Sequence, residues 1–577
     1  MPGIYLLLAV LIAAPAADSH ASRPTVTGAM RKWSPVVLSF QGPETGETAV
    51  PNPFTDYRLT VRFTHKEEVF AVPGYYAADG NSAESGAESG SVWRVKFAPD
   101  EVGVWNYVAE FQTGPNIAIA DMQEKGQPAA FDGATGSFEV GPPDPNAPGY
   151  EAKGILRSMR SRYPQFAETG EYFIKGGVDS PENMLAFADF DGTTPTHRFE
   201  PHAGDWREGN PSWRGGKGKN LIGALNYLAS KEINSVYFLT MNVIGDGKDV
   251  WPWTEDTERY RFDCSKLDQW EVVFSHMDRL GLMLHVVHQE QENDQLLDGG
   301  ELGPERKLYY RELIARFAHH PALVWNLGEE NTNTDGQLKA FSAYVHDLDP
   351  YGHPIVVHTY PGAYEKIYGP LLGYPYFDGA SLQIADMTDT HDVTLKWVTE
   401  STKAGKPWMV CLDEIGPPSI GVKPDSEDPE HAGVSRFALW GNLMAGGAGC
   451  EWFFQSDIRS EDWRSREKMW DLTRVALTFF HRDIPFAEME PRDDFVQGGE
   501  SWCLAKPGEV YAVYTAKPAE CRIDLPPGAY TVSWYDPRAG GSLQEGKPLS
   551  GGASRELGLP PSDADRDWVA VIRKSES

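Results

Sequence analysis

The chain of 577 residues is poor in cysteine and lacks the common metal-protease and serine-hydrolase motifs. Its five cysteines include no CxxC pair, which excludes zinc ribbons and thioredoxin-like redox sites. Five cysteines cannot all pair within one chain, although a bridge between Cys503 and Cys521 is possible. Neither HExxH nor GxSxG occurs, so proteolysis has no support in the sequence, and we expect no metal and no organic cofactor.

Positive charge is also scarce along the chain. Lysine and arginine together number 52, against 83 aspartates and glutamates, and the formal net charge is -31. A chain this acidic repels polyphosphates and anionic bilayers, because like charges resist close approach. Nucleic acid and membrane surfaces are therefore poor partners, and the acidity itself is typical of a solvated protein surface.

Long hydrophobic runs are absent after the first residues of the chain. Residues 4–14 are almost wholly apolar, and Ser19, His20 and Ala21 follow with the small residues that a signal peptidase reads. The run is shorter than the roughly 18 to 20 residues that a bilayer requires. We therefore expect a signal peptide over residues 1–21, cleaved near Ala21, export to the periplasm or the medium, and no membrane insertion of the mature chain.

Both ends of the mature chain show the period-two pattern of β-strands. Tyr57–Phe63 and Val104–Val108 alternate between turn residues, and a proline-rich linker follows at residues 141–149. This predicts an N-terminal β-sandwich over residues 26–141. The helical pattern stops after Phe480, and the short alternating runs Val510–Thr515, Tyr530–Tyr535 and Trp568–Ile572 predict a C-terminal β-sandwich over residues 489–574.

Between these ends, residues 150–488 alternate apolar strands with amphipathic helices such as Glu305–His319, a pattern typical of a parallel sheet wrapped in helices. Eight candidate strands occur in this region: Tyr172–Lys175, Ser235–Thr240, Leu282–Val287, Leu323–Leu327, Pro354–His358, Ala380–Ile384, Trp408–Leu412 and Gly449–Phe454. Eight strands over about this length predict an α/β fold, a central (β/α)8 TIM barrel, with its active site at the carboxyl ends of the strands.

Two of these strands end in carboxylates. Leu323–Leu327 runs through Gly328 into Glu329 and Glu330, and the seventh strand is followed by Asp413 and Glu414. Glycoside hydrolysis needs such a pair, one carboxylic acid to protonate the leaving oxygen and one carboxylate to attack the anomeric carbon. Consecutive strand residues point to opposite sides, so only one of the adjacent pair on strand four is expected to face the barrel axis.

These residues resemble the retaining glycoside hydrolases of clan A. The resemblance is carried by Trp-x-Leu-x-x-Glu from Trp325 to Glu330, and by Lys-Pro followed by Asp-Glu-Ile-Gly around Glu414. It implies a TIM barrel that cleaves an oligosaccharide or polysaccharide by double displacement. Glu330 then takes the position of the general acid/base and Glu414 that of the nucleophile. The clan's usual Asn before the acid/base is Glu329 here, so the resemblance does not say how the sugar's 2-hydroxyl is held.

The chain also resembles bacterial proteins that carry a sandwich domain of unknown function before such a barrel. Residues 177–183, which follow strand one, are similar to their barrel entry. Residues 534–540 resemble their C-terminal module, which is named for collagen binding in a collagenase. The resemblance extends to the apiosidase-like barrels, whose substrate does not carry over.

Other polar and aromatic residues near the strand ends are candidates for holding the sugar, because aromatic rings suit its apolar faces and polar groups its hydroxyls. Tyr360 is the candidate to hold the nucleophile, and each of the others could equally be structural. The substrate-binding candidates are Glu329, Asn331, Asn242, Trp253, His288, Gln289, His358, Tyr360, Gln383, Trp452 and Gln455.

One alternative function stays open. In it the barrel is a scaffold, and the exported protein binds glycan or collagen without cleaving it.

Overall fold

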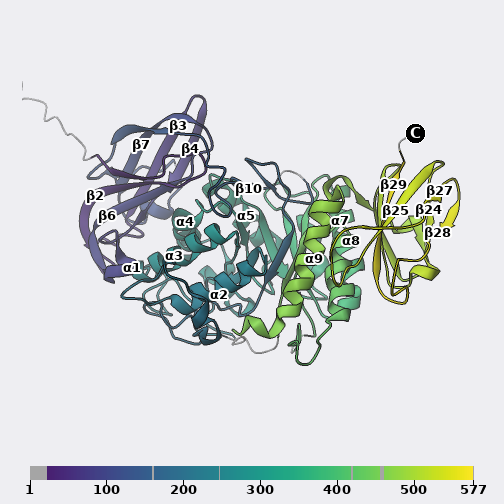
Figure 1. The fold of residues 1–577 in the computed structure, drawn as a ribbon. Helices are drawn as coiled ribbons and strands as arrows, with labels where there is room; N and C mark the ends of the chain where they lie inside the picture. The colour runs from purple at the N-terminus through teal and green to yellow at the C-terminus, as the bar shows by residue number, and fades with distance from the viewer. Residues whose placement is uncertain are drawn as a thin grey trace, which may run out of the picture.

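The computed structural model describes residues 23–575, with gaps at 122, 159–160, 246, 418–419 and 455–460. Three parts follow one another in space: N-terminal sheets in purple, a central barrel in teal and green, and C-terminal sheets in yellow (Figure 1). The expected signal peptide, residues 1–21, lies outside the described residues, and so does Gln455. No helix among the described residues is both long and apolar enough to cross a bilayer.

The centre of the molecule is a closed barrel of eight parallel strands, in chain order, with the last strand pairing with the first. These strands are β12 (Lys175–Val178), β13 (Ser235–Leu239), β14 (Met283–Val287), β15 (Leu323–Asn326), β16 (Ile355–Thr359), β17 (Gly379–Ile384), β18 (Met409–Ile415) and β19 (Gly449–Trp452). Because their side chains are buried on both faces of the sheet, these strands are near-continuous apolar runs, and the runs predicted the strands from the sequence. The predicted TIM barrel is confirmed.

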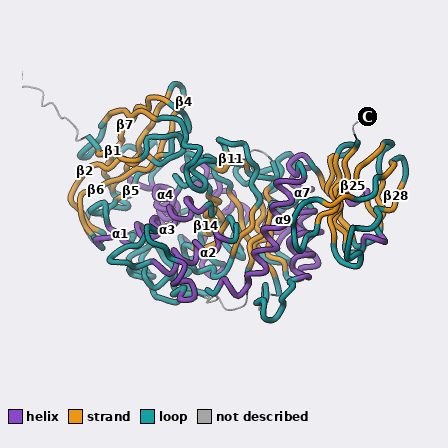
Figure 2. Tube along the Cα trace, viewed as in Figure 1, coloured by secondary structure: helices purple, strands orange, loops and turns teal. Residues whose placement is uncertain are grey.

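Helices surround the strands (Figure 2). They are α2 (Lys219–Ser230), α3 (Cys264–Leu280), α4 (Pro304–Phe317), α5 (Asp335–Leu348), α6 (Tyr364–Ile367), α7 (Thr390–Lys403), a π-helical turn (Val434–Trp440) that continues into α8 (Gly441–Met444), and α9 (Glu467–Asp483). Local chemistry fixes their ends: Thr334 and Gln337 form a reciprocal capping box at the start of α5, and Gly281 ends α3 with φ at 74°.

The prediction for strand one was wrong by three residues. It placed the strand at Tyr172–Lys175, whereas β12 begins at Lys175 and runs through Gly176 and Gly177. A Cβ atom on Gly177 would lie 2.0 Å from the Ser235 hydroxyl, so the neighbouring strand leaves room only for glycine. Because glycine carries no apolar side chain, the sequence of this strand lacks the apolar run that predicted the others.

The N-terminal part is a β-sandwich of two antiparallel sheets. Phe63 of one sheet stacks on Phe97 of the other with ring centroids 4.2 Å apart, so aromatic side chains fill the space between them. One sheet holds β1 (Thr25–Gly28), β2 (Val36–Gly46), β6 (Ser89–Phe97) and β5 (Tyr75–Tyr76); the other holds β4 (Glu68–Pro73), β3 (Tyr57–His65), β7 (Gly103–Thr113), β8 (Gln127–Pro128) and β9 (Thr135–Val140). A short helix, α1 (Ser82–Ser85), precedes β6, and the hairpin of β10 (Leu156–Arg157) and β11 (Gln165–Phe166) leads into the barrel.

This sandwich packs on the outer side of α4. The Arg316 guanidinium donates to the Tyr76 carbonyl at 2.9 Å and lies over the Tyr75 ring, while Arg311 donates to the Leu59 carbonyl at 2.8 Å. Arg316 is itself paired with Glu312 at 2.7 Å inside the interface. Because the arginines are buried and hydrogen-bonded, the sandwich and the barrel are held together by specific polar contacts.

The C-terminal part is again built of two antiparallel sheets. One holds β20 (Glu490–Pro491), β22 (Ser501–Lys506), β23 (Val510–Thr515), β29 (Trp568–Lys574), β25 (Ala529–Tyr535), β26 (Gln544–Glu545) and β27 (Leu549–Ser550); the other holds β21 (Val496–Gln497), β24 (Arg522–Asp524) and β28 (Ser554–Glu556). Tyr535 donates to the Val475 carbonyl of α9 at 2.8 Å, which ties these sheets to the barrel. Cys503 and Cys521 are both buried and free, so the bridge between them does not form.

Candidate active site

The loop after β15 carries two of the predicted residues in an unusual backbone conformation. Glu330 has φ at 42°, a left-handed value that side-chain-bearing residues seldom adopt, and Gly328 has φ at 155°. Two backbone hydrogen bonds hold the loop: Glu329 N–H to the Gln289 carbonyl at 2.8 Å, and Asn331 N–H to the His358 carbonyl at 3.0 Å. Backbone strain of this kind is kept where the surrounding structure over-determines it, which is common at functional sites.

Glu414 is aimed by an irregularity in its own strand. Along the pairing of β17 with β18, Leu382 lies opposite Leu412, but Gln383 lies opposite Glu414, so Asp413 is an extra residue. A bulge of this kind re-aims the side chains that follow it. Asp413 and Glu414 are consequently both buried inside the barrel although they are adjacent.

The two glutamates line the same cavity, of about 390 Å³, at the carboxyl ends of the strands. The Gln383 amide donates from Nε2 to Glu330 Oε1 at 2.9 Å, and it is also a hydrogen-bond partner of the Glu414 carboxyl. A volume of this size falls in the range of roughly 300–1,000 Å³ that small-molecule sites occupy. The walls are formed by Gln291, Glu330, Tyr360, Pro361, Gln383, Ile384, Ala385, Glu414 and Gly416.

Burial sets the protonation of this pair. It raises the pKa of Glu414 to about 8; the hydrogen bond from Gln383 opposes that rise, and the nearby charge of Glu330 adds to it. Two carboxyls that interact this strongly lose their protons in two steps that belong to the pair rather than to either residue. Near neutral pH this pair of carboxyls therefore keeps a proton.

His358, at the end of β16, lies beside Glu414. Its Nε2 is 3.7 Å from Glu414 Oε2, and its Nδ1 is 3.2 Å from the Tyr237 hydroxyl. Burial lowers the pKa of His358 to about 3, so the ring is neutral. When the Tyr237 hydroxyl donates to Nδ1, Nε2 carries the ring proton and points it at Glu414.

More carboxyls lie around the cavity than a catalytic pair requires. Glu329 is 4% exposed and Asp179 is fully buried, and neither Oε2 of Glu329 nor either oxygen of Asp179 has a hydrogen-bond partner among the described residues. Burial raises the pKa of Glu329 well above its usual range, and the charges of Glu182, Glu290 and Glu414 raise it further. Strand alternation did not separate Glu329 from Glu330, because β15 ends at Asn326, before either of them.

Of the remaining substrate-binding candidates, Tyr360 and Gln383 line the cavity and His358 lies next to it. Six others are buried in structural contacts instead: Asn242, Trp253, His288, Gln289, Asn331 and Trp452. Trp452 donates from its indole nitrogen to the Thr473 hydroxyl of α9 at 2.9 Å, so its ring lies in the barrel wall rather than on the floor of the cavity.

The other buried candidates serve the loops beneath the cavity. Gln289 and Asn331 both bond to Asp294, and Gln289 also accepts from Arg306 at 2.7 Å. The His288 ring packs between Tyr310 and Trp325. Trp253 packs on Tyr309 and Asn242 bridges to Val250, which places both in the packed base of the loop after β13.

Sequence reasoning missed Asp179, Tyr237 and Tyr364. Asp179 directly follows β12, and its position at a strand end was hidden by the misplaced strand. Tyr364 donates its hydroxyl to the Gln383 carbonyl and so holds that residue's backbone in place. Tyr237 lies within β13, inside an apolar run where an aromatic residue is expected to be core.

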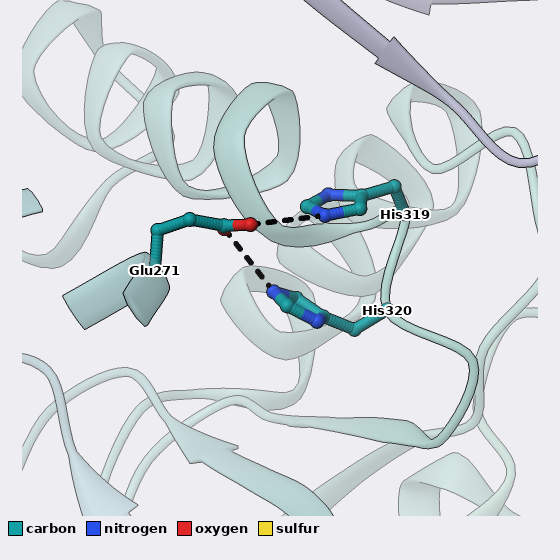
Figure 3. Close-up of side chains that lie close together, drawn as sticks. All are labelled: Glu271, His319 and His320. Carbon is teal, nitrogen blue, oxygen red and sulfur yellow. Dashed lines mark hydrogen bonds and ion pairs between the residues drawn. The ribbon is translucent and has the colours of Figure 1, made fainter. Parts of the chain in front are cut away.

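Three groups of histidine and carboxylate side chains among the described residues are close enough to bind a cation. In the group of Glu271, His319 and His320, the Glu271 carboxylate points at both rings (Figure 3), at 3.3 Å from each. That carboxylate is already paired with the Lys96 ammonium at 2.6 Å. The charge of this carboxylate is therefore balanced by a lysine.

The second group, His285, Asp413 and Glu451, lies in the barrel interior and also surrounds a lysine. Lys175 Nζ is 2.6 Å from Asp413 Oδ1 and 3.1 Å from Glu451 Oε2, and His285 Nδ1 is 2.6 Å from the same Glu451 oxygen. The third group is Glu329, His358 and Glu414, whose ligand atoms lie within 4.8 Å of one another. No lysine or arginine of the described part of the chain forms an ion pair with these three residues.

Similarity to known proteins agrees with this architecture. The family of a domain of unknown function, DUF5060, matches residues 29–112. A structure of a candidate glycoside hydrolase from Bacteroides vulgatus ATCC 8482 superposes with a TM-score of 0.61 at 16% identity, over 94% of this chain and 99% of that one. A glycoside hydrolase family 5 structure from the same organism gives 0.53 at 15% identity, over 74% and 94%.

These superpositions show a shared fold, that of a glycoside-hydrolase-like TIM barrel. Among curated proteins, none matches the sequence. The expected likeness of the C-terminal sheets to a collagen-binding module stays a prediction.

Proposed function

We propose that this protein is a retaining glycoside hydrolase, with Glu330 as general acid/base and Glu414 as nucleophile. The observation that carries the proposal is the convergence of these two glutamates, from strands four and seven, on one cavity where a single amide bonds to both. Paired carboxyls across a sugar-sized cavity are the arrangement that double displacement needs.

In the first step the Glu414 carboxylate bonds to the anomeric carbon while Glu330 gives its proton to the glycosidic oxygen, and the bond between that carbon and that oxygen breaks. In the second step Glu330, now a carboxylate, takes a proton from water. The water oxygen bonds to the anomeric carbon, and the ester to Glu414 breaks. The pair returns to one acid and one carboxylate, as microscopic reversibility requires.

The surroundings of Glu414 serve this cycle. The Gln383 amide donates to the charged form of the nucleophile, and the His358 Nε2 proton faces the same carboxylate. Both interactions favour the ionised carboxyl against the burial that disfavours it. The reactive form of the pair is the one in which Glu414 is ionised and Glu330 holds the proton for the leaving oxygen.

Removing the nucleophile tests the proposal. The Glu414→Ala variant should lose about 10⁴-fold in kcat, because the covalent route disappears while binding remains. Added azide should restore turnover and give a glycosyl azide whose anomeric configuration is opposite to that of the substrate. Exposed Glu400→Ala on α7 is the control and should keep full activity. Full activity of Glu414→Ala would exclude this mechanism, and glycan binding without turnover by the unchanged protein would favour the scaffold function.

We also propose that the chain is exported, on the strength of the apolar segment at residues 4–14. Mass spectrometry of the protein recovered outside the cytoplasm should find a mature chain that begins near residue 22. A chain that retains residue 1 in that fraction would contradict cleavage.

A further inference from the structure

The protein has a consistent way of treating buried groups of carboxylate and histidine. In two of the three groups an ammonium lies among the acidic oxygens, that of Lys96 beside Glu271 and that of Lys175 beside Asp413. The Lys175 ammonium is also 3.3 Å from His285 Nδ1. Ammonium ions thus sit against both the carboxylate and the imidazole in this chain.

The third group, Glu329, His358 and Glu414, has the same chemistry and no such lysine within the described ranges. It also has unmet hydrogen-bonding capacity, because Glu329 Oε2 is buried and accepts no hydrogen bond there. Asp179, whose two oxygens also make none, is a further buried carboxyl close to Glu329 and Glu414. Buried polar atoms without partners are rare, and each one points to a group that is missing from the site.

The position of the group fixes what it can touch on a bound sugar. Glu414 is the residue proposed to bond to the anomeric carbon, and the ligand atom of Glu329 lies within 4.8 Å of that of Glu414. In an aldose glycoside carbon 2 is bonded to the anomeric carbon, so its substituent lies near the nucleophile. Glu329, one of whose oxygens has no partner among the described residues, is therefore within reach of that substituent and can accept a hydrogen bond from it.

We propose that the sugar bound against Glu414 carries a free amino group on carbon 2, so that the substrate is a glycan of unacetylated 2-amino-2-deoxy sugar. This rests on the proposed function. The ammonium of the sugar takes the place that Lys96 and Lys175 take in the other two groups, and it donates to Glu329. An acetylated nitrogen is neutral and bulky, so it satisfies neither the charge nor the space.

A divalent metal ion is the competing occupant. Carboxylates with one histidine are a known ligand set for zinc, but a metal bound to Glu414 would occupy the lone pairs that the nucleophile needs. The two lysine-filled groups show that this chain balances such sites with ammonium. The sugar amine is therefore the occupant that leaves the proposed chemistry intact.

Three matched substrates test the inference, aryl glycosides that differ only at carbon 2 by a hydroxyl, a free amine or an N-acetyl group, in both gluco and galacto configurations. The free amine should give a kcat/KM at least tenfold above the hydroxyl and the acetamide. Cleavage of the hydroxyl substrate as well as or better than the amine would overturn the inference while the proposed function stands.

Glu329→Gln keeps the shape of the side chain and removes its charge. Its preference for the amine over the hydroxyl should fall at least tenfold, mainly through a higher KM for the amine substrate. Glu400→Gln, which removes a carboxylate from the barrel exterior, should leave the preference unchanged. An unaltered preference in Glu329→Gln would overturn the assignment of that residue.

Binding measurements distinguish the proposed hydrolase activity from the proposed recognition of the amine. Glu330→Gln should not turn over yet keeps Glu329, His358 and Glu414, so calorimetry should detect the unacetylated oligosaccharide and not its acetylated form. Amine binding with no cleavage of any substrate by the unchanged protein would refute the hydrolase and keep the ammonium site. If Zn²⁺ alone binds there and the amine neither binds nor is cleaved, the group is a metal site and the inference fails.

Discussion

Two groups of acidic side chains lie next to each other in the same barrel, and they differ by one lysine. Tyr237 packs between them, with its ring 4.7 Å from that of His285 and 6.0 Å from that of His358. Around Lys175, the carboxylates of Asp413 and Glu451 are paired with its ammonium. Around Glu414 no such cation is present among the described residues, and the oxygens face a cavity.

The difference teaches which carboxyls hold the fold and which are available for chemistry. A buried carboxylate with an ammonium beside it has its charge balanced within the chain. A buried carboxyl without a neighbouring ammonium stays protonated until a cationic ligand binds. Raised carboxyl pKa values therefore mark functional sites. The contrast makes Lys175 a structural residue and supports the roles proposed for Glu329 and Glu414.

The largest effect should come from breaking the paired group. Lys175→Met leaves Asp413 and Glu451 buried without a counter-ion, so the free energy of unfolding should fall by about 3–5 kcal/mol. Urea unfolding followed by tryptophan fluorescence measures it. A loss below about 1 kcal/mol would show that Lys175 does not stabilise the fold, so that the ammonium makes no difference between the two groups.

Removing a carboxyl from the group around Glu414, which has no lysine beside it among the described residues, should instead stabilise the protein. The folded chain holds the Glu414 proton up to a pKa of about 8, whereas an unfolded glutamate releases it near 4.5. The folded state therefore binds more protons between these values, and stability falls as pH rises through them. Glu414→Gln escapes this loss, so its unfolding free energy relative to the unchanged protein should be nearly equal at pH 4 and higher by about 1–3 kcal/mol at pH 8.

A gain that is the same at both pH values would show that Glu414 does not hold a raised pKa. Glu400→Gln, measured beside it, removes an exposed carboxyl and should show no such trend.

Gln383 connects the catalytic pair, so its loss should act on the pH profile. Gln383→Leu removes a hydrogen bond that favours the charged form of Glu414, and the pKa of that carboxyl should rise further. Because the nucleophile must be ionised, the acidic limb of kcat/KM should move to higher pH, and the maximum should fall by about 10- to 100-fold. An acidic limb at the same pH as in the unchanged protein would show that Gln383 does not influence the pKa of Glu414.

The smallest effect belongs to an exposed pair. Lys339 and Asp335 lie 3.4 Å apart on the surface of α5, where water screens the attraction. Lys339→Met should change the free energy of unfolding by no more than about 0.5 kcal/mol. The difference between the losses of unfolding free energy in Lys175→Met and Lys339→Met measures how much the burial of the ion pair contributes.

Much of the barrel could be read from the sequence because parallel strands buried on both faces are continuous apolar runs. That pattern placed Glu330 and Glu414 at the ends of strands four and seven. It did not show the two glycines of β12, the extra residue Asp413 in β18 or the left-handed backbone of Glu330. These features decide where side chains point, and they depend on contacts with neighbouring strands rather than on local periodicity.

The sequence was a poorer guide to the sugar-binding candidates. Trp253, His288 and Trp452 stand near strand ends, where a ring can line the cavity or be structural, and they are buried against α4, β15 and α9. Asp179 gave no signal beyond its residue type. Burial by segments distant in sequence is the property that separates the two groups, and one sequence does not show it.

The anomeric configuration of the first product is the most direct test of the central claim, that Glu330 and Glu414 act together across one cavity by double displacement. Proton nuclear magnetic resonance, recorded in the first minutes on a glycan that the purified protein cleaves, distinguishes the two anomers before they interconvert. The account predicts a product with the configuration of the substrate. A first product of inverted configuration would contradict it.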